Sequence, residues 1–230
     1  MKASMPTVLI PCAGFGKRVG EPPAKELLKL PSENNPLIHW CLDLTKKFKM
    51  RPVLITRKDK KAFLEYIETI RDAYNIELCL IDASKEWPDT LLKSDSCWTE
   101  QNIVLLPDTR FSPDDILPKL SDSLKKNDLA FATFSVPGAN SDKFSCWGVL
   151  KSDGANYWIA EKPRNADEVF TQAWGLFAFK KEFGVDLLTK MLESNGDHEF
   201  KKINTTKIET FSLDFFQDVT RDKTQFCFNY

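Results

Sequence analysis

The sequence predicts an α/β fold, with a mixed, mostly parallel sheet covered by helices on both faces. Short apolar runs rich in β-branched residues alternate with longer amphipathic segments over residues 1–125, a pattern typical of parallel strands joined by helices. Strand-like runs dominate residues 129–179, so we expect antiparallel strands at one edge. No linker rich in proline, glycine or serine divides the 230 residues, and we expect residues 1–230 to form a single domain.

Each expected element follows from local periodicity and from turn residues. The expected strands are Thr7–Pro11, Pro52–Thr56, Ile76–Ile81, Ile103–Leu106, Leu129–Phe134, Cys146–Lys151, Tyr157–Ala160, Gln172–Phe179, Lys207–Phe211 and Gln225–Phe228. The expected helices are Leu37–Phe48, Lys60–Tyr74, Thr90–Trp98, Asp114–Lys126 and Lys181–Leu192. Ser112 followed by Pro113 predicts a helix start, because serine caps helices and proline fits their first turn.

Composition excludes several classes of protein. Lysine and arginine number 32 against 33 acidic residues, so the formal charge of −1 argues against a general binder of nucleic acid or membrane surfaces. The six cysteines form no C-x-x-C pair and there are two histidines, which argues against a zinc site, a disulfide framework or a histidine-based triad. No apolar stretch is long enough to cross a bilayer, and we expect a cytoplasmic protein.

A run of cations lies between Thr45 and Lys61, with Asp59 as its one acid. Such a run could bind nucleic acid or a partner, but a solvated helix face is the favoured interpretation. Trp87 and Trp158 could stack on a base or a sugar, although packing explains most of the aromatic residues.

A glycine loop after the first strand is the main functional signal. It reads Gly14-Phe15-Gly16-Lys17-Arg18, and Lys25 follows a proline-stiffened bend. Glycines let backbone N–H groups approach an anion, and the cations complete a candidate phosphate site. A dinucleotide fingerprint would need glycine where Val19 stands, and a Walker loop would need serine or threonine in place of Arg18. A plain glycine turn with exposed cations remains the alternative.

The stretch Pro11–Leu28 resembles the opening signature of sugar-1-phosphate nucleotidyltransferases, especially UDP-glucose pyrophosphorylases and glucose-1-phosphate thymidylyltransferases. Further motifs follow in the order of that family: Pro36-Leu37-Ile38, Pro107-Asp108, Trp147-Gly148-Val149, Glu161-Lys162-Pro163, Trp174-Gly175 and the segment that ends at Asp218. The resemblance implies a three-layer α/β/α, Rossmann-like nucleotidyltransferase fold of the GT-A-like type.

The chain departs from the family pattern at Lys17, Ala24 and Thr109. The segment Glu86–Leu92 also lacks the glycine with which the family reads the nucleotide base.

By resemblance, each matching residue has an implied role. The implied catalytic residues are Arg18 and Lys25; the implied nucleotide-binding residues are Ala13, Gly14, Gly16, Lys17 and Asp89; the implied sugar-phosphate-binding residues are Gly148, Glu161, Lys162 and Gly175; and the implied Mg²⁺ ligands are Asp108 and Asp218.

The resemblance implies an enzyme that couples a nucleoside triphosphate, UTP or dTTP, to a sugar 1-phosphate with Mg²⁺ as cofactor, releasing pyrophosphate. Two alternatives stay open: a cytidylyltransferase acting on an alditol or choline phosphate, and an inactive protein that binds nucleotide or sugar phosphate on the same fold. No nucleic-acid or membrane partner is expected, and a homo-oligomer is left open.

Overall fold

The computed structural model describes residues 5–14, 24–30, 33–135, 147–163, 172–196 and 199–219. Its strands are β1 (Thr7–Pro11), β2 (Arg51–Arg57), β3 (Glu77–Ile81), β4 (Gln101–Val104), β5 (Thr109–Ser112), β6 (Leu129–Ser135), β7 (Gly148–Ser152), β8 (Tyr157–Glu161), β9 (Gln172–Lys180), β10 (Lys201–Lys202), β11 (Ile208–Ser212) and β12 (Phe215–Asp218). Its helices are α1 (Ile38–Lys47), α2 (Lys61–Tyr74), α3 (Trp87–Leu92), α4 (Ile116–Ser123) and α6 (Lys181–Glu193), with 3₁₀ turns η2 (Lys25–Leu27) and η3 (Asp95–Cys97).

A large mixed sheet organises the described residues. Its strand order is β10-β8-β7-β9-β4-β1-β2-β3, with β6 also paired to β9 and β11 to β6. The strands from β4 to β3 pair in parallel, whereas β9 pairs with β4, β6 and β7 in the antiparallel direction. The predicted change from parallel to antiparallel pairing is therefore confirmed. A separate two-stranded sheet joins β5 to β12.

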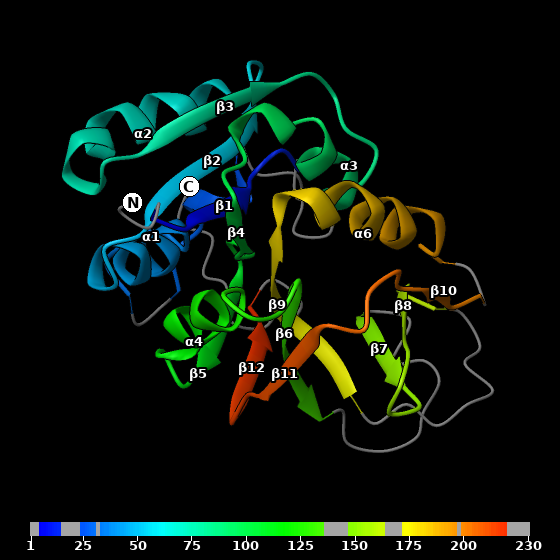
Figure 1. The fold of residues 1–230 in the computed structure, drawn as a ribbon. Coiled ribbons are helices and arrows are strands. Elements are labelled where there is room, and N and C mark those ends of the chain that lie inside the picture. The colour runs from blue at the N-terminus through cyan, green and yellow to red at the C-terminus, as the bar shows by residue number, and fades with distance from the viewer. Residues whose placement is uncertain are drawn as a thin grey trace.

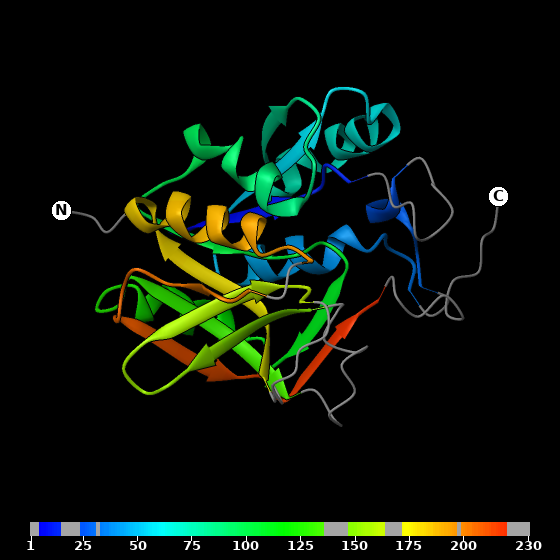
Figure 2. The same ribbon diagram turned by 90° about the vertical axis from the view of Figure 1, so that its right-hand side faces the viewer.

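Helices cover both faces of the large sheet, which confirms the predicted α/β architecture. In Figure 1, α1, α2 and α4 lie to the left of the sheet, and α3 and α6 lie to the right. Figure 2 shows α6 in front of the strands and α1 behind them. Successive side chains of a strand point to opposite faces, and β1 accordingly sends Val8 and Ile10 to one cluster and Leu9 to the other.

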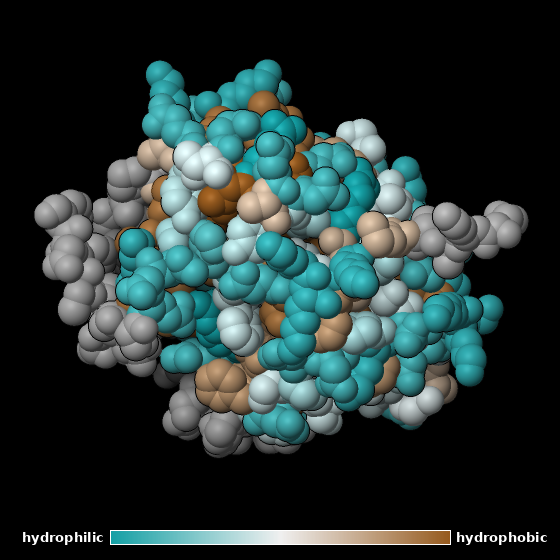
Figure 3. All heavy atoms as spheres, turned by 90° about the vertical axis from the view of Figure 1, so that its left-hand side faces the viewer, coloured by the Kyte–Doolittle hydropathy of each residue, from teal (hydrophilic) through white to brown (hydrophobic). Residues whose placement is uncertain are grey.

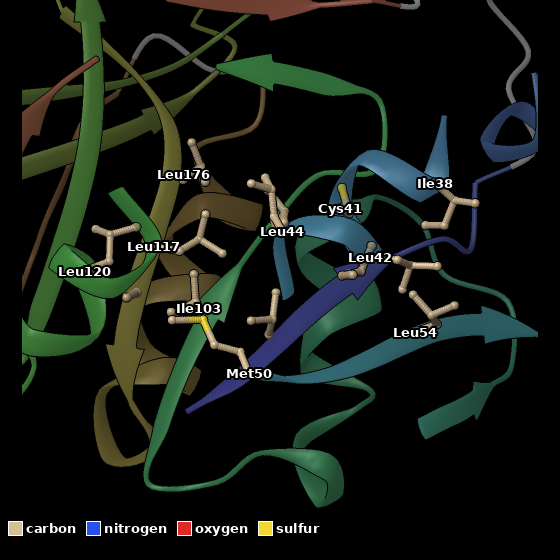
Figure 4. Packing of buried hydrophobic residues seen from close by; sticks show 14 of the residues in the cluster. Ile38, Cys41, Leu42, Leu44, Met50, Leu54, Ile103, Leu117, Leu120 and Leu176 are labelled. Atoms are coloured by element: carbon tan, nitrogen blue, oxygen red, sulfur yellow. The ribbon is translucent and has the colours of Figure 1, made fainter. Parts of the chain in front are cut away.

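The core on the α1 side holds both halves of the sheet together. In Figure 4, Leu117 of α4 and Leu176 of β9 lie near Ile103 of β4, whereas Leu42 of α1 lies beside Leu54 of β2. These side chains are fully buried, so this face of the sheet is a continuous apolar layer beneath the loops that follow β1 and β4.

The surface over α1, α2 and α4 is mostly hydrophilic, with hydrophobic residues in scattered patches (Figure 3). Most cations between residues 45 and 61 lie at the surface, but they do not form the predicted helix face: Arg51 and Arg57 are the end residues of β2, and Lys60 is fully buried. Within the described part of the chain, no helix is long and apolar enough to cross a membrane.

The structure corrects two element predictions. Ser112 is the last residue of β5 rather than a helix cap, and α4 begins at Ile116 after Asp115. The helix expected over Thr90–Trp98 is instead the short α3, which starts at Trp87, followed by η3. The strands β5, β10 and β12 were not expected, and the predicted strand Gln225–Phe228 lies outside the described residues.

Candidate active site

Lys25 and two carboxylates converge next to the end of β1. The Nζ atom of Lys25 lies 2.6 Å from Oδ2 of Asp108, in an ion pair whose side chains are 19% and 9% exposed. Asp108 follows β4 by four residues, and Asp218 is the last residue of β12. Both carboxylates raise the pKa of Lys25, so Asp218 also lies within electrostatic reach of the ammonium group.

The β5–β12 pair brings Asp218 to Asp108. Asp218 lies opposite Thr109 in this antiparallel pair, and the backbone N–H of Val219 donates to the carbonyl oxygen of Asp108 at 2.9 Å. Phe216 fixes the other end of β12, because its ring stacks on Phe134 with the centroids 4.3 Å apart. Two segments distant in the sequence are thus joined at the residues expected to carry the metal.

The surroundings of Lys25 favour its protonated, positively charged form. Burial alone would lower the pKa of Lys25, but the negative charges of Asp108, Glu26 and Asp218 and the hydrogen bond to Asp108 outweigh it, so the pKa is raised. Lys25 is therefore a fixed positive charge at neutral pH, in a place where it can neutralise phosphate oxygens.

The start of the glycine loop lies beside this cluster. The N–H of Cys12 donates to the carbonyl of Ile55 at 2.7 Å, which extends the β1–β2 pairing by one residue. Ala13 is buried, whereas Gly14 is exposed. Among the described residues, no atom lies within 4 Å of where a Cβ at Gly14 would stand, so there is room for a ligand to approach the backbone.

A buried lysine that the sequence analysis assigned to the surface contacts this loop. The Nζ atom of Lys60 donates to the carbonyls of Cys12 and Gly14 at 2.7 and 2.9 Å, and to Oε2 of Glu26 at 2.7 Å. Burial raises the pKa of Glu26, while the charges of Lys60 and Lys25 act in the opposite direction. No local pattern marks Lys60, because it stands in a run of exposed cations.

Glu161 and Lys162 form a second cluster at the end of β8. Glu161 is buried, and its Oε1 accepts a hydrogen bond from the indole Nε1 of Trp87 at 3.1 Å. Oε2 of Glu161 has no hydrogen-bond partner among the described residues. Burial raises the pKa of Glu161, and Lys162 and Trp87 oppose this only in part. An unpartnered carboxylate oxygen of this kind can accept a hydrogen bond from a ligand hydroxyl.

Lys162 lies between two acids. Its Nζ is 3.5 Å from Oε1 of Glu161 and 3.5 Å from Oε2 of Glu86. Its backbone has a φ of 50°, in the left-handed region that is unfavourable for a non-glycine residue. The chain turns here at the strand end, which directs the lysine toward α3, the helix that holds Trp87.

The predicted glycines make room for aromatic rings. Gly148 of β7 lies in register between Glu161 of β8 and Trp174 of β9. A Cβ at Gly148 would stand 2.1 Å from the indole of Trp174, and one at Gly175 would stand 2.3 Å from the ring of Phe216. These glycines therefore permit close packing of the backbone against the two rings.

Asp89 has local partners. Its Oδ2 accepts the backbone N–H of Lys85 at 2.8 Å and lies 3.3 Å from Nζ of Lys93. Asp89 thereby helps to hold the first turn of α3, which carries Trp87 toward Glu161. Arg18, Gly16 and Lys17 lie outside the described residues, so their implied roles remain predictions.

The residues present fit a magnesium ion that is shared with a substrate. Mg²⁺ prefers hard oxygen ligands and is commonly held by one or two carboxylates together with substrate phosphates and water. Asp108 and Asp218 are two such residues, brought near each other by the β5–β12 pair and both acting on Lys25. Over the described ranges, no group of three or more histidine, cysteine, aspartate or glutamate side chains could hold a metal ion. Phosphate oxygens and water are the further ligands that such a two-carboxylate site takes.

Comparison with solved structures identifies the fold. A protein from Bacillus anthracis assigned as a glucose-1-phosphate thymidylyltransferase, in complex with sucrose, matches with a TM-score of 0.71 at 15% identity, covering 94% of this chain and 90% of that one. A UDP-glucose pyrophosphorylase complexed with UDP-glucose matches with a TM-score of 0.69 at 15% identity, covering 94% of both chains. No protein-family model and no curated protein matches the sequence. The chain thus has the fold of sugar-1-phosphate nucleotidyltransferases, as the motifs predicted.

Proposed function

We propose that this protein is a sugar-1-phosphate nucleotidyltransferase, which joins a nucleoside triphosphate, UTP or dTTP, to a sugar 1-phosphate and releases pyrophosphate. The observation that carries the proposal is the convergence of Lys25, Asp108 and Asp218 at the end of the glycine-loop strand. The fold shared with two structures of this class supports it.

The reaction is mainly a problem of charge and position. A phosphate oxygen of the acceptor attacks the α-phosphorus of the triphosphate, the new P–O bond forms, and the bond to the leaving pyrophosphate breaks. Two polyanions must meet, so positive charge held in place supplies most of the catalysis. Bound Mg²⁺ would supply a Lewis acid that screens the phosphate oxygens.

The chain's own residues divide this work. Lys25 places an ammonium group where charge grows at the α-phosphorus, and Asp108 and Asp218 would hold the metal. Arg18 is proposed to neutralise the leaving pyrophosphate. At the acceptor side, Lys162 would bind the sugar phosphate.

Glu161 would accept a hydrogen bond from a sugar hydroxyl, since one of its carboxylate oxygens is buried without a hydrogen-bond partner among the described residues. Its other oxygen already accepts the indole N–H of Trp87.

The test is a pyrophosphate-release assay on the purified full chain with Mg²⁺, using four nucleoside triphosphates against a panel of sugar 1-phosphates, ribitol phosphate and choline phosphate. We expect release with UTP or dTTP and a sugar 1-phosphate. The variant Lys25→Ala should lose roughly 100-fold in turnover, because it removes a charge aimed at the transition state. Lys29→Ala, at an exposed lysine four residues on, is the matched control and should keep full turnover.

The other outcomes separate the alternatives. Release only with CTP and an alditol or choline phosphate would identify a cytidylyltransferase. Nucleotide binding without release from any pair would identify an inactive binding protein. Unchanged turnover in Lys25→Ala would refute the role of this lysine.

A further inference from the structure

Lys60 is an unusual lysine, because its side chain is fully buried in the core next to the proposed active site. Lysine is almost never buried without partners, since taking an ammonium group out of water is costly. An ammonium group has three N–H donors, and here three acceptors lie within 2.9 Å of Nζ: the carbonyls of Cys12 and Gly14 and Oε2 of Glu26.

Stability alone does not account for this arrangement. A buried ion pair is often no more stabilising than apolar side chains of similar size, because desolvation offsets the attraction. Apart from its three acceptors, Lys60 also lies next to apolar core: its Nζ is 5.1 Å from the ring centroid of Phe63, another fully buried residue. An aliphatic residue could fill the same space, but it would leave the carbonyls of Cys12 and Gly14 without this donor, so the specific effect of the ammonium group is on these two carbonyls and on Glu26.

The acceptors of Lys60 lie on both sides of the loop that carries the glycine motif. Gly14 directly precedes residues 15–23, and Glu26 comes shortly after them. One ammonium group therefore joins the two ends of the segment that contains Gly16, Lys17 and Arg18. Groups that are held in place before binding do not have to be ordered by the bound triphosphate, so fixing Gly14 and Glu26 in advance favours binding.

The same contacts orient the groups that would face phosphate. In a trans peptide the C=O and the following N–H point in opposite directions, so the carbonyl of Cys12 that faces Lys60 turns the N–H of Ala13 away from it. Glu26 is anchored inward and is the neighbour of Lys25 in η2, which leaves Lys25 to reach Asp108 on the other side.

We propose that Lys60 is a positioning residue, which from inside the core holds the backbone of Cys12 and Gly14 on one side and Glu26 on the other, and thereby fixes Lys25 and the backbone at Cys12–Gly14 for triphosphate binding. This inference rests on the proposed nucleotidyltransferase function. Lys60 touches no substrate; it acts through Cys12, Gly14 and Glu26.

The test compares a variant that removes both buried charges with a surface control. In Lys60→Met/Glu26→Gln, the methionine keeps an unbranched apolar stem and no carboxylate is left without a cation, so the fold should survive. Lys61→Met changes the next residue, an exposed lysine that is the first residue of α2. The single variant Glu26→Gln removes the negative charge but keeps an oxygen that can accept a hydrogen bond from Lys60. It therefore separates the effect of the ion pair from the effect of the hydrogen bonds that Lys60 donates to Cys12 and Gly14.

Three measurements are made on each full-length variant: thermal unfolding, the dissociation constant for inorganic tripolyphosphate by calorimetry, and the kinetics of pyrophosphate release. For Lys60→Met/Glu26→Gln we expect a folded protein at the assay temperature, tripolyphosphate binding weakened at least about tenfold and turnover reduced about 100-fold, the scale of misplaced reacting groups. Lys61→Met should match the wild type, and Glu26→Gln should fall between the two.

Wild-type phosphate binding and turnover in folded Lys60→Met/Glu26→Gln would overturn the inference, as would an equal loss in Lys61→Met. If the double variant does not fold, the single variant Glu26→Gln decides: the inference fails if its binding and turnover are those of the wild type. A wild-type protein that neither binds tripolyphosphate nor releases pyrophosphate with any substrate pair would refute the proposed function itself, and the inference with it.

Discussion

Replacing Gly175 by alanine should displace the strand that carries Asp218. A Cβ at position 175 would stand 2.3 and 2.5 Å from two carbons of the Phe216 ring, whereas ordinary contacts lie at 3.4–4 Å. The ring must therefore move by about 1 Å. It has little freedom to do so, because it stacks on Phe134 and meets Trp147 edge to face with centroids 5.5 Å apart.

Two effects of Gly175→Ala follow. Overpacking of this kind costs about 1–3 kcal/mol of stability, and each kcal/mol lowers the melting temperature of a chain this size by about 2–4 °C. A shift of about 1 Å in Asp218, the carboxylate proposed to hold the metal, can cost about 100-fold in turnover. Thermal unfolding and pyrophosphate release measure the two effects on the same samples.

The variant Phe216→Ala supplies the control. If the clash with Phe216 is the cause, Gly175→Ala should add little further loss once the ring is absent, so the double variant should be far from additive. If Gly175 instead contacts the sugar, the loss should appear in the KM for sugar phosphate and persist in the Phe216→Ala background. That second pattern, or wild-type behaviour of Gly175→Ala, would refute the packing argument.

Two further predictions concern Glu161. Burial raises the pKa of Glu161 above 4.5, so the folded state holds the carboxyl proton more tightly than the unfolded state does. The contribution of Glu161 to folding stability is therefore present below pH 4.5 and is lost as the pH rises through the folded-state pKa. Glu161→Gln should therefore melt above the wild type at pH 7 but not at pH 4 in thermal unfolding, and equal melting at pH 7 would contradict this. Trp87→Phe keeps a ring against Trp174, 5.5 Å away, but removes the N–H that donates to Glu161; the KM for sugar phosphate should rise about tenfold with little change in kcat, and a fall in kcat alone would argue against this role.

The fold was predictable where apolar periodicity is strong. The strands that form the parallel half of the sheet are continuous apolar runs, and helices such as α2 show clear amphipathic spacing. β5 and β12 were missed because each is short and partly polar, and their pairing joins segments far apart in the sequence. A single-sequence pattern contains no signal for such a contact.

The candidate site was likewise predictable only in part. Asp108 was predictable because an apolar strand leads directly to it, and the motif order pointed to Lys25 and Asp218. The burial of Lys60 was not predictable, since its three acceptors come from other elements and its neighbours in the sequence are exposed cations. The sequence suggested that Trp87 could stack on a base or a sugar, whereas in the structure its indole N–H donates a hydrogen bond to Glu161.

The β5–β12 pair has a consequence for how the protein is made. Chains emerge from the ribosome starting at the amino end, and the central strands can begin to pair before synthesis is complete. Asp218 lies on a strand that comes after all the strands of the large sheet, so a nascent chain can hold much of its architecture while the second carboxylate is still missing. A nucleotide ligand that needs both acids cannot help such a chain to fold, and can stabilise only the finished molecule.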